Sequence, residues 1–357
     1  MKIFAPGHNP NLPITLFYGG TERLAFDKEA WKWYKLFDDG TRKPMYGVTS
    51  VLKIIAKEAI GPWMVKVALA KVKSLLIAGG YVGGEWALFE NVLDEILAKA
   101  KKEDRDILED AGNLGHEAHA FLQEYGDLTL AGKCDRRLEL LAHFPNDDRV
   151  ANCCVAGLAF FSAHNVRFIH CERPVYSRKY QCVGTADAIC LTDSCDDSAC
   201  CPEFFRDSKT LLDYKTSNAL YGSYLAQAAL YAHAYEEETG EHIERRFVLR
   251  LGKTECEFES WHMAGDKLQA EDLALYVHAL ELYQSVHLVD DRIAEMSRKA
   301  TAVKRALEKI VRDAKYAIKC LEADEYKGVK RKKGCNDTDK MCMACEEIYA
   351  KRHLPAT

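Results

Sequence analysis

Two apolar segments, residues 166–191 and 209–216, most constrain how this chain can fold, because both have the composition of β-strands. They are rich in Val, Ile, Phe, Tyr and Cys. Side chains alternate between the two faces of a strand, so Asp213 and Lys215 are expected to point the same way. If the two segments form neighbouring strands, the carboxylates of Asp187 and Asp213 come together beside one lysine.

Two carboxylates beside a lysine suit a divalent cation and a phosphate group. Mg2+ is a hard cation that binds carboxylate and carbonyl oxygens together with substrate phosphate. We expect Asp187, Asp213 and the backbone carbonyl of Tyr214 to supply such oxygens. Lys215 is expected to orient an attacking water or to help deprotonate it. The pattern therefore predicts a site for Mg2+ or Mn2+ and the chemistry of a phosphodiesterase.

Four short motifs follow one another along the chain. They are Gly-x-x-x-His at 112–116, Gly-x-x-Asp at 184–187, Asp-x-Lys at 213–215 and Gln-x-x-x-Tyr at 227–231. In this order they resemble the PD-(D/E)xK nuclease superfamily, and within it the RecB-like exonucleases of phages, CRISPR adaptation and mitochondrial genome maintenance. The resemblance covers about residues 45–285.

The segment that precedes these motifs is also similar to the phage members of that branch. Residues 46–52 read Tyr-Gly-Val-Thr-Ser-Val-Leu, and Gly61-Pro62-Trp63 follows. The chain departs from the family at Gly47, which stands nearly where Pro-Ser is usual. We expect Trp63 either to stack on bases or to belong to the core.

The resemblance implies an α/β fold with a restriction-endonuclease-like core, in which helices flank a central mixed sheet. It implies Mg2+- or Mn2+-dependent hydrolysis of linear DNA, from the ends of single strands or opened duplex. His116 would add a metal ligand, while Gln227 and Tyr231 would orient Lys215 or the scissile strand. Glu172 stands where family members often carry an acid near the site. The implied setting is the cytoplasm of a bacterial or phage-infected cell, with recombination proteins of phage or host as partners.

A long helix is expected over about residues 86–126, and it carries the first motif. Two glycines inside a helix cost roughly 1 kcal/mol each relative to alanine, so Gly112 and Gly115 indicate that something packs closely there. One side of this helix is apolar and the other carries glycine, histidine and glutamine. The apolar side holds Ile107, Ala111, Leu114, Ala118, Phe121 and Tyr125, and the other holds Gly112, His116, His119 and Gln123.

Three other functional assignments are open to the same sequence. An endonuclease, restriction-like or junction-resolving, would use the same residues. A catalytically inactive nucleic-acid-binding scaffold would keep the fold, although the intact His116, Asp187, Asp213 and Lys215 argue against it. An enzyme of unrelated chemistry lacks support, because the chain has neither a P-loop nor a G-x-S-x-G motif.

A cysteine-bearing tail offers a second possible metal site. Its cysteines are Cys320, Cys335, Cys342 and Cys345, with His353 downstream. Some RecB-like nucleases hold a [4Fe-4S] cluster with three C-terminal cysteines and one cysteine before the histidine helix. Here the first cysteine is Cys134, after that helix, so a cluster would need Cys320, and Zn2+ with His353 is the alternative. The loop cysteines at 195, 200 and 201 are too irregular to assign.

Charge is distributed unevenly along the 357 residues. The formal net charge of -5 is not that of a typical nucleic-acid binder, yet residues 291–333 carry 14 Lys or Arg against 7 Asp or Glu. This stretch ends in Lys330, Arg331, Lys332 and Lys333. It is consistent equally with a solvated helix face and with phosphate contact.

The expected organisation is a strand-rich segment at 1–48, a nuclease core at 49–290 and a basic helical extension with the cysteine tail at 291–357. Beyond the elements above, we expect helices from 49 to 78 with a break at Gly61-Pro62, and from 223 to 239. Strands are expected at 245–252 and 255–261, then one helix to about 290 and another to about 322. No stretch has the length of a signal peptide or membrane span, so no membrane partner is expected.

Overall fold

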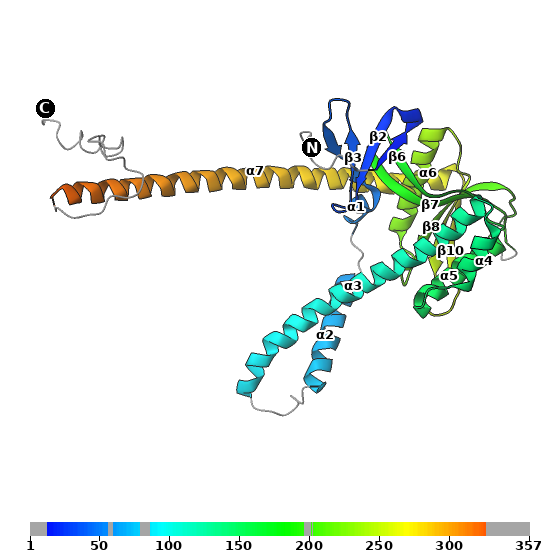
Figure 1. Ribbon diagram of the computed structural model, residues 1–357, viewed down its shortest axis with the longest axis horizontal. Helices are drawn as coiled ribbons and strands as arrows, with labels where there is room; N and C mark the ends of the chain where they lie inside the picture. The colour runs from blue at the N-terminus through cyan, green and yellow to red at the C-terminus, as the bar shows by residue number, and fades with distance from the viewer. Residues whose placement is uncertain (1–12, 56–59, 79–85, 196–200, 202, 326–357) are drawn as a thin grey trace. The chain divides into compact units, whose positions relative to one another are not determined.

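The computed structural model describes residues 13–55, 60–78, 86–195, 201 and 203–325. The chain divides into two compact units, Met1–Tyr283 and Gln284–Thr357. It has the α/β fold predicted from the sequence: a mixed sheet flanked by helices, an antiparallel sheet near the N-terminus and a long C-terminal helix (Figure 1). Within the described residues, no helix is both long and apolar enough to cross a membrane.

The N-terminal strands form a four-stranded antiparallel sheet. Its strands are β1 (Ile14–Phe17), β2 (Glu22–Asp27), β3 (Lys32–Leu36) and β4 (Arg42–Pro44), paired in sequence order. A short 3-10 turn, η1 (Tyr18–Gly20), joins β1 to β2. Phe17 and Leu24 pack against Tyr176 and Val183 of the central sheet, so this small sheet has its apolar contacts with the central sheet.

The central sheet has the order β10-β9-β8-β7-β5, and β6 pairs with the other edge of β7. The β5–β7 and β8–β9 pairs are parallel, whereas β6–β7, β7–β8 and β9–β10 are antiparallel. The strands are β5 (Tyr46–Gly47), β6 (Arg167–Ser177), β7 (Cys182–Thr192), β8 (Ser208–Lys215), β9 (Arg245–Leu251) and β10 (Phe258–Ala264).

Helices cover both faces of this sheet. Side chains of α1 (Val48–Leu52), α6 (Gly222–Thr239) and the first turns of α7 (Asp266–Glu325) pack with Leu211 on one face. Side chains of α3 (Trp86–Leu130) and α5 (Asp148–Ala163) pack with Leu212 on the other. Neither leucine is exposed to solvent, and burial of each contributes roughly 1.5–3 kcal/mol. Because successive side chains of β8 point to opposite faces of the sheet, this one strand packs against both helical layers.

Two further helices complete the described chain. α2 (Ile60–Ala78) lies alongside α3 (Figure 1), and α4 (Cys134–Ala142) follows α3. The break expected at Gly61-Pro62 lies earlier in the chain, because α1 ends at Leu52 and α2 begins at Ile60, which places Gly61 and Pro62 in the first turn of α2. α6 ends as predicted at Gly240, whose left-handed φ of 74° closes a helix without the strain of a side chain.

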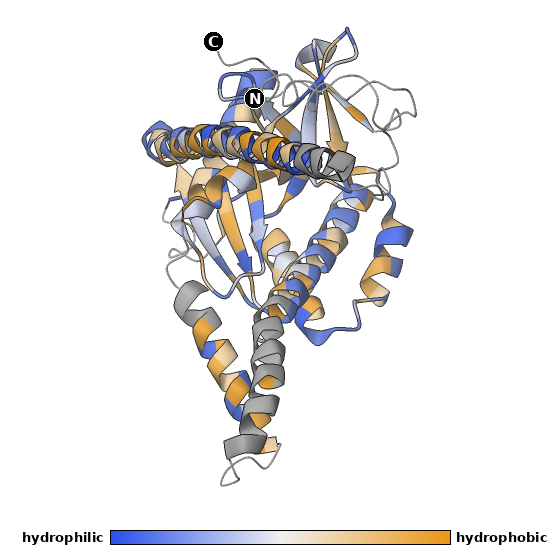
Figure 2. Cartoon of the chain, turned by 90° about the vertical axis from the view of Figure 1, so that its left-hand side faces the viewer, coloured by the Kyte–Doolittle hydropathy of each residue, from blue (hydrophilic) through white to orange (hydrophobic). Residues whose placement is uncertain are grey.

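Two features of the helices were not predicted. α5 is capped by the preceding residue, Asp147, whose side chain accepts the backbone N–H of Arg149 as is typical of an N-cap. The two helices expected after β10 are one, α7, because neither Gly nor Pro occurs between 266 and 325 to end it near Asp290. Hydrophilic and hydrophobic residues alternate along α7 (Figure 2), and in the second unit Ile293 and Met296 are among its exposed apolar side chains.

Candidate metal and phosphate site

A gap in the strand pairing of β7 creates the site. β6 pairs along β7 from Cys182 to Leu191. On the opposite edge, β5 pairs only with residues 182–183 and β8 only with residues 188–192. Gly184-Thr185-Ala186-Asp187 lies between these two partners. The Gly-x-x-Asp motif thus occupies a stretch where one edge of the strand is open to side chains from elsewhere.

Asp187 uses this gap to contact two other elements. Its Oδ2 accepts the backbone N–H of Tyr214 in β8 at 2.5 Å, in place of a strand-to-strand hydrogen bond. Its Oδ1 lies 3.5 Å from Nδ1 of His119 in α3. Burial by itself raises the pKa of Asp187, but the charge and hydrogen bond of His119 outweigh it, so the pKa lies below its usual range. Asp187 is therefore ionised at neutral pH.

Glu172 on β6 completes a cluster with these two side chains. One ligand atom each from His119, Glu172 and Asp187 lie within 4.8 Å of one another. Glu172 has a φ of 45°, a left-handed conformation that is uncommon for a non-glycine residue and costs of order 1–3 kcal/mol. Burial, and next the nearby charge of Asp187, raise the pKa of Glu172 to about 7. A strained backbone thus holds the Glu172 carboxyl beside the carboxylate of Asp187.

Asp213 and Lys215 form a buried ion pair at the end of β8. Lys215 Nζ lies 2.5 Å from Asp213 Oδ2, and the two side chains are 15% and 1% exposed. Burial raises the pKa of Asp213 to about 6 even though Lys215 lowers it. Burial also lowers the pKa of Lys215, but Asp213 more than compensates, so that pKa lies above its usual range. The Lys215 ammonium also lies 5.1 Å from the ring centroid of Tyr224.

The alternation predicted for β8 is confirmed by its neighbours. The Tyr214 ring is buried in the layer of α3 and α5, where it lies 5.6 Å from the His119 ring, edge to face. Tyr224 is buried in the opposite layer, beside Lys215. The two faces of β8 therefore carry different parts of the site. A metal-ligand role for the Tyr214 carbonyl stays a prediction.

Gln227 and Tyr231 of α6 form a buried hydrogen bond, in which Gln227 Nε2 donates to Tyr231 Oη at 3.0 Å. The Tyr231 ring lies over Gly184, where a Cβ would come within 2.5 Å of Cε1. Burial, and then the charge of Asp213, raise the Tyr231 pKa above its usual range. Among the residues that the structure describes, no hydrogen bond links either side chain to Lys215. Their predicted role in orienting Lys215 stays a prediction.

The two histidines of α3 occupy different surroundings. His116, the predicted ligand, is exposed, and its ring centroid lies 6.1 Å from that of Trp31. His119 contacts Asp187 instead. The Gly-x-x-x-His pattern also fits Gly115 to His119, a second register of the same motif that the prediction of His116 left aside.

The glycines of α3 support the second register. A Cβ at Gly115 would lie 3.0 Å from Thr216 Oγ1, just past β8. A Cβ at Gly112 would meet no described heavy atom within 4 Å. The close packing predicted for both glycines therefore holds at Gly115, which lets α3 approach the end of the strand that carries Asp213 and Lys215.

A cleft of about 720 Å³ opens beside these side chains. His116, His119, Tyr214 and Lys215 line it, so it reaches both groups of polar residues described above. Two basic residues, Arg149 and Lys253, also line it. Arg149 is already paired with Asp110 at 2.7 Å and with Asp147 at 2.6 Å, which neutralises much of its charge.

Other predicted site residues lie outside what the structure describes. Trp63 and Cys320 lie within α2 and α7, but their side chains are not described. The remaining predicted residues of the tail fall wholly outside the described residues: Lys330, Arg331, Lys332, Lys333, Cys335, Cys342 and Cys345.

The residues gathered here fit a hard divalent cation. Carboxylates from Asp187 and Glu172 and an imidazole from His119 form one compact donor set. Among the described atoms, Asp213 Oδ1 is buried with no hydrogen-bond partner, which fits an oxygen available to bind a cation. Acids whose pKa values are raised by burial and mutual repulsion are also the groups that a cation would stabilise.

No model of a known protein family matches the chain, and no curated protein matches it. What the site can do therefore follows from the geometry of its own side chains.

Proposed function

We propose that this protein is a divalent-metal-dependent nuclease that hydrolyses phosphodiester bonds of DNA. One observation carries the proposal: His119, Glu172 and Asp187 converge within 4.8 Å, and Asp187 hydrogen-bonds the backbone between Asp213 and Lys215. Acidic oxygens, one imidazole and one ammonium are thus brought together where the middle of β7 meets the end of β8. This combination suits a cation and an anionic substrate together.

His119, Glu172, Asp187 and Asp213 are the residues that would hold Mg2+ or Mn2+. When bound, the cation lowers the pKa of a water molecule and neutralises charge that builds on the phosphate. Glu172 and Asp213 must release their protons to bind it, because only the carboxylate form is an effective ligand. Asp187 is already ionised and hydrogen-bonded to β8, so it is held in place before the cation arrives.

Lys215 would act as a fixed positive charge. Its pKa is raised by Asp213, so the ammonium keeps its proton at neutral pH. A protonated lysine cannot accept a proton from water, which favours orientation of the water or stabilisation of the phosphate over a role as general base. Of the two roles predicted for Lys215, the electrostatic one therefore has the better support.

An exonuclease that acts on single strands or opened duplex ends is the form of the activity that we propose. The cleft beside His119 and Lys215 has the volume of a small-ligand site, which suits one terminal nucleotide better than the full width of a duplex. A setting in phage or bacterial recombination stays a prediction from the resemblance.

The decisive test uses end-labelled linear single-stranded and duplex DNA beside covalently closed circles. Each substrate is incubated with Mg2+, Mn2+ or EDTA, and the wild type is compared with Asp187→Asn and Lys215→Ala. Lys267→Ala, at a lysine whose side chain is 88% exposed, serves as the matched control for loss of a lysine. We expect metal-dependent loss of linear DNA that both site variants abolish and the control retains.

Other outcomes of the same assay would change the assignment. Cleavage of closed circles would make the protein an endonuclease. DNA binding without cleavage in either metal would leave a nucleic-acid-binding scaffold of this fold.

A further inference from the structure

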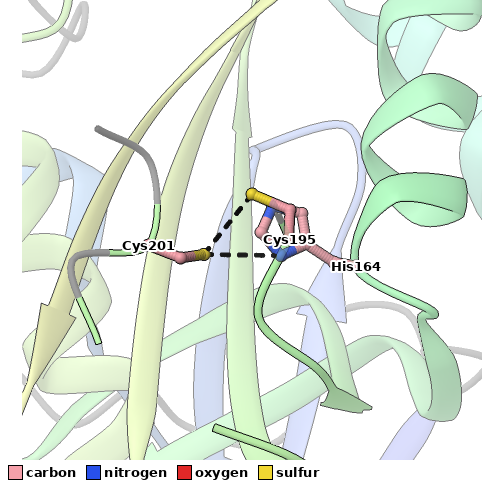
Figure 3. A group of neighbouring side chains, drawn as sticks. All are labelled: His164, Cys195 and Cys201. Atoms are coloured by element: carbon pink, nitrogen blue, oxygen red, sulfur yellow. Dashed lines mark hydrogen bonds between the residues drawn. The ribbon is translucent and has the colours of Figure 1, made fainter. Parts of the chain in front are cut away.

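A second cluster of ligand-type side chains lies outside the proposed nuclease site. It consists of His164, Cys195 and Cys201 (Figure 3). His164 is the residue that ends α5, Cys195 follows β7, and Cys201 precedes β8. The three residues therefore join the end of a helix to the loop between the two strands that carry Asp187 and Asp213. Thirty residues separate His164 from the first of these cysteines in the sequence, and the irregular spacing of the loop cysteines gave no assignment.

The distances within this cluster match those around a tetrahedral zinc ion. Zn–S bonds of about 2.3 Å and Zn–N bonds of about 2.0–2.1 Å place two sulfurs about 3.8 Å apart and a sulfur and a nitrogen about 3.6 Å apart. Cys195 Sγ lies 3.6 Å from Cys201 Sγ, and Cys201 Sγ lies 3.9 Å from His164 Nδ1. A disulfide would require a sulfur separation of about 2.05 Å. The two thiols are therefore not joined by a disulfide, and all three ligand atoms lie within 4.8 Å of one another, a spacing that fits three ligands of one ion.

The surroundings of the cluster favour a site without net charge. His164 is 0% exposed and Cys201 is 6% exposed. The rings of Phe160 and Phe247 lie 4.1 and 5.2 Å from the His164 ring, between centroids. One Zn2+ with two thiolates and a neutral imidazole is formally uncharged. Such a unit is less costly to bury among aromatic rings than separate ions.

The imidazole must change its tautomer to bind a metal. His164 Nδ1 lies 3.0 Å from the carbonyl oxygen of Asp193. Without a metal, Nδ1 therefore carries the proton of the neutral imidazole and donates a hydrogen bond to that oxygen. With a metal on Nδ1, the proton moves to Nε2 and the bond to Asp193 is replaced by the bond to the ion. The exchange leaves the imidazole neutral.

We propose that His164, Cys195 and Cys201 bind a structural zinc ion, which fastens the loop between β7 and β8 to the end of α5. These three residues supply three of the four ligands of a tetrahedral zinc ion. The identity of the fourth ligand does not follow from them. The proposal is independent of the nuclease assignment, since none of the three residues belongs to the cluster around Asp187.

The test measures zinc in the full-length chain after the tail cysteines have been changed to serine at 320, 335, 342 and 345. This background removes the thiols that a zinc ion bound in the tail would need as ligands. Zinc content is measured by mass spectrometry of the metal after exhaustive dialysis, and the fold is checked by circular dichroism. We expect about one zinc per chain in this background, and at least tenfold less in His164→Asn, Cys195→Ser and Cys201→Ser. The exposed Cys134→Ser is the matched control and keeps its zinc.

A second measurement covers the case in which the variants fail to fold. X-ray absorption at the zinc edge, on the unmutated site in the same background, reports the atoms bound to the metal. At least two sulfurs and one nitrogen are expected. Zinc bound without sulfur, zinc retained in all three variants, or no zinc after growth in zinc-supplemented medium would each overturn the proposal. None of these readings depends on DNA cleavage, so failure of the zinc site and failure of the nuclease assignment are distinguishable.

Discussion

His119 Nδ1 lies 3.5 Å from Asp187 Oδ1, whereas His116, three residues earlier on the same helix, lies edge to face with Trp31. Both histidines follow a glycine by four residues, so the motif by itself does not choose between them. The packing does, because Gly115 and not Gly112 is the glycine at which α3 comes close to the end of β8.

This difference gives a matched pair of variants. His119→Ala is expected to weaken Mn2+ binding by about 10- to 100-fold and to slow cleavage accordingly, because it removes one donor from a compact set. His116→Ala is expected to change both by less than about threefold. Metal titrations by calorimetry, together with cleavage rates, test the pair. A larger effect at His116 than at His119 would support the original prediction that His116 is the metal ligand.

Replacing Lys215 should slow the reaction without removing the cation. Lys215→Ala removes a positive charge aimed at the site, and a loss of roughly 100- to 1,000-fold in the single-turnover rate is typical for such a group. Metal affinity should fall little or even rise, because a cation no longer competes with the ammonium for Asp213. Calorimetry and single-turnover kinetics measure the two quantities separately. Loss of metal binding in this variant would contradict the electrostatic role.

Metal affinity should rise with pH between about 5.5 and 8. The pKa of Asp213 is about 6 and that of Glu172 about 7, so both carboxylates lose protons across this interval, and protons stop competing with the cation. Glu172→Gln should flatten the upper part of the profile. The apparent dissociation constant for Mn2+, measured across this interval in both proteins, tests the expectation. A profile of identical shape in the variant would remove Glu172 from the metal site.

The same carboxylates predict how stability depends on pH without metal. A carboxyl whose pKa is raised in the folded state favours folding least when it is ionised. The metal-free protein should therefore lose stability as pH rises from about 4, near the ordinary pKa of these groups, until both are ionised at about pH 7. Bound cation removes this penalty. The increase in Tm on adding Mn2+ should therefore be larger at pH 8 than at pH 5.5. Differential scanning calorimetry at both pH values decides this.

Gly184→Ala should destabilise the protein by about 1–3 kcal/mol, the usual cost of overpacking, because its Cβ would meet the Tyr231 ring at 2.5 Å. The double variant with Tyr231→Leu should cost less than the sum of the two single changes. Gly112→Ala, with open space at its Cβ, should be neutral or stabilising by up to about 1 kcal/mol. Urea unfolding gives all four values. Full additivity would show that the ring can move away freely.

The strands and their alternation were predictable because they depend on local patterns. The period of two in β8 correctly separated Tyr214 from Lys215, and Gly240 correctly marked the end of α6. The pairing of β6 and β7 that brings Glu172 beside Asp187 is a tertiary arrangement, and the left-handed backbone at Glu172 has no sequence signature. The grouping of His164 with two loop cysteines likewise needs a helix end and two strand ends to meet.

The contact between Gly184 and Tyr231 also has a consequence for descent. The two positions are 47 residues apart in the sequence, yet a side chain at position 184 would occupy the space of the Tyr231 ring. Neither position can therefore change freely while the other stays the same. Lineages that replace the glycine should also carry a smaller residue in place of the tyrosine, and those that keep the ring should keep the glycine. Covariation of this pair, more than retention of either motif, would then trace which distant chains share the architecture.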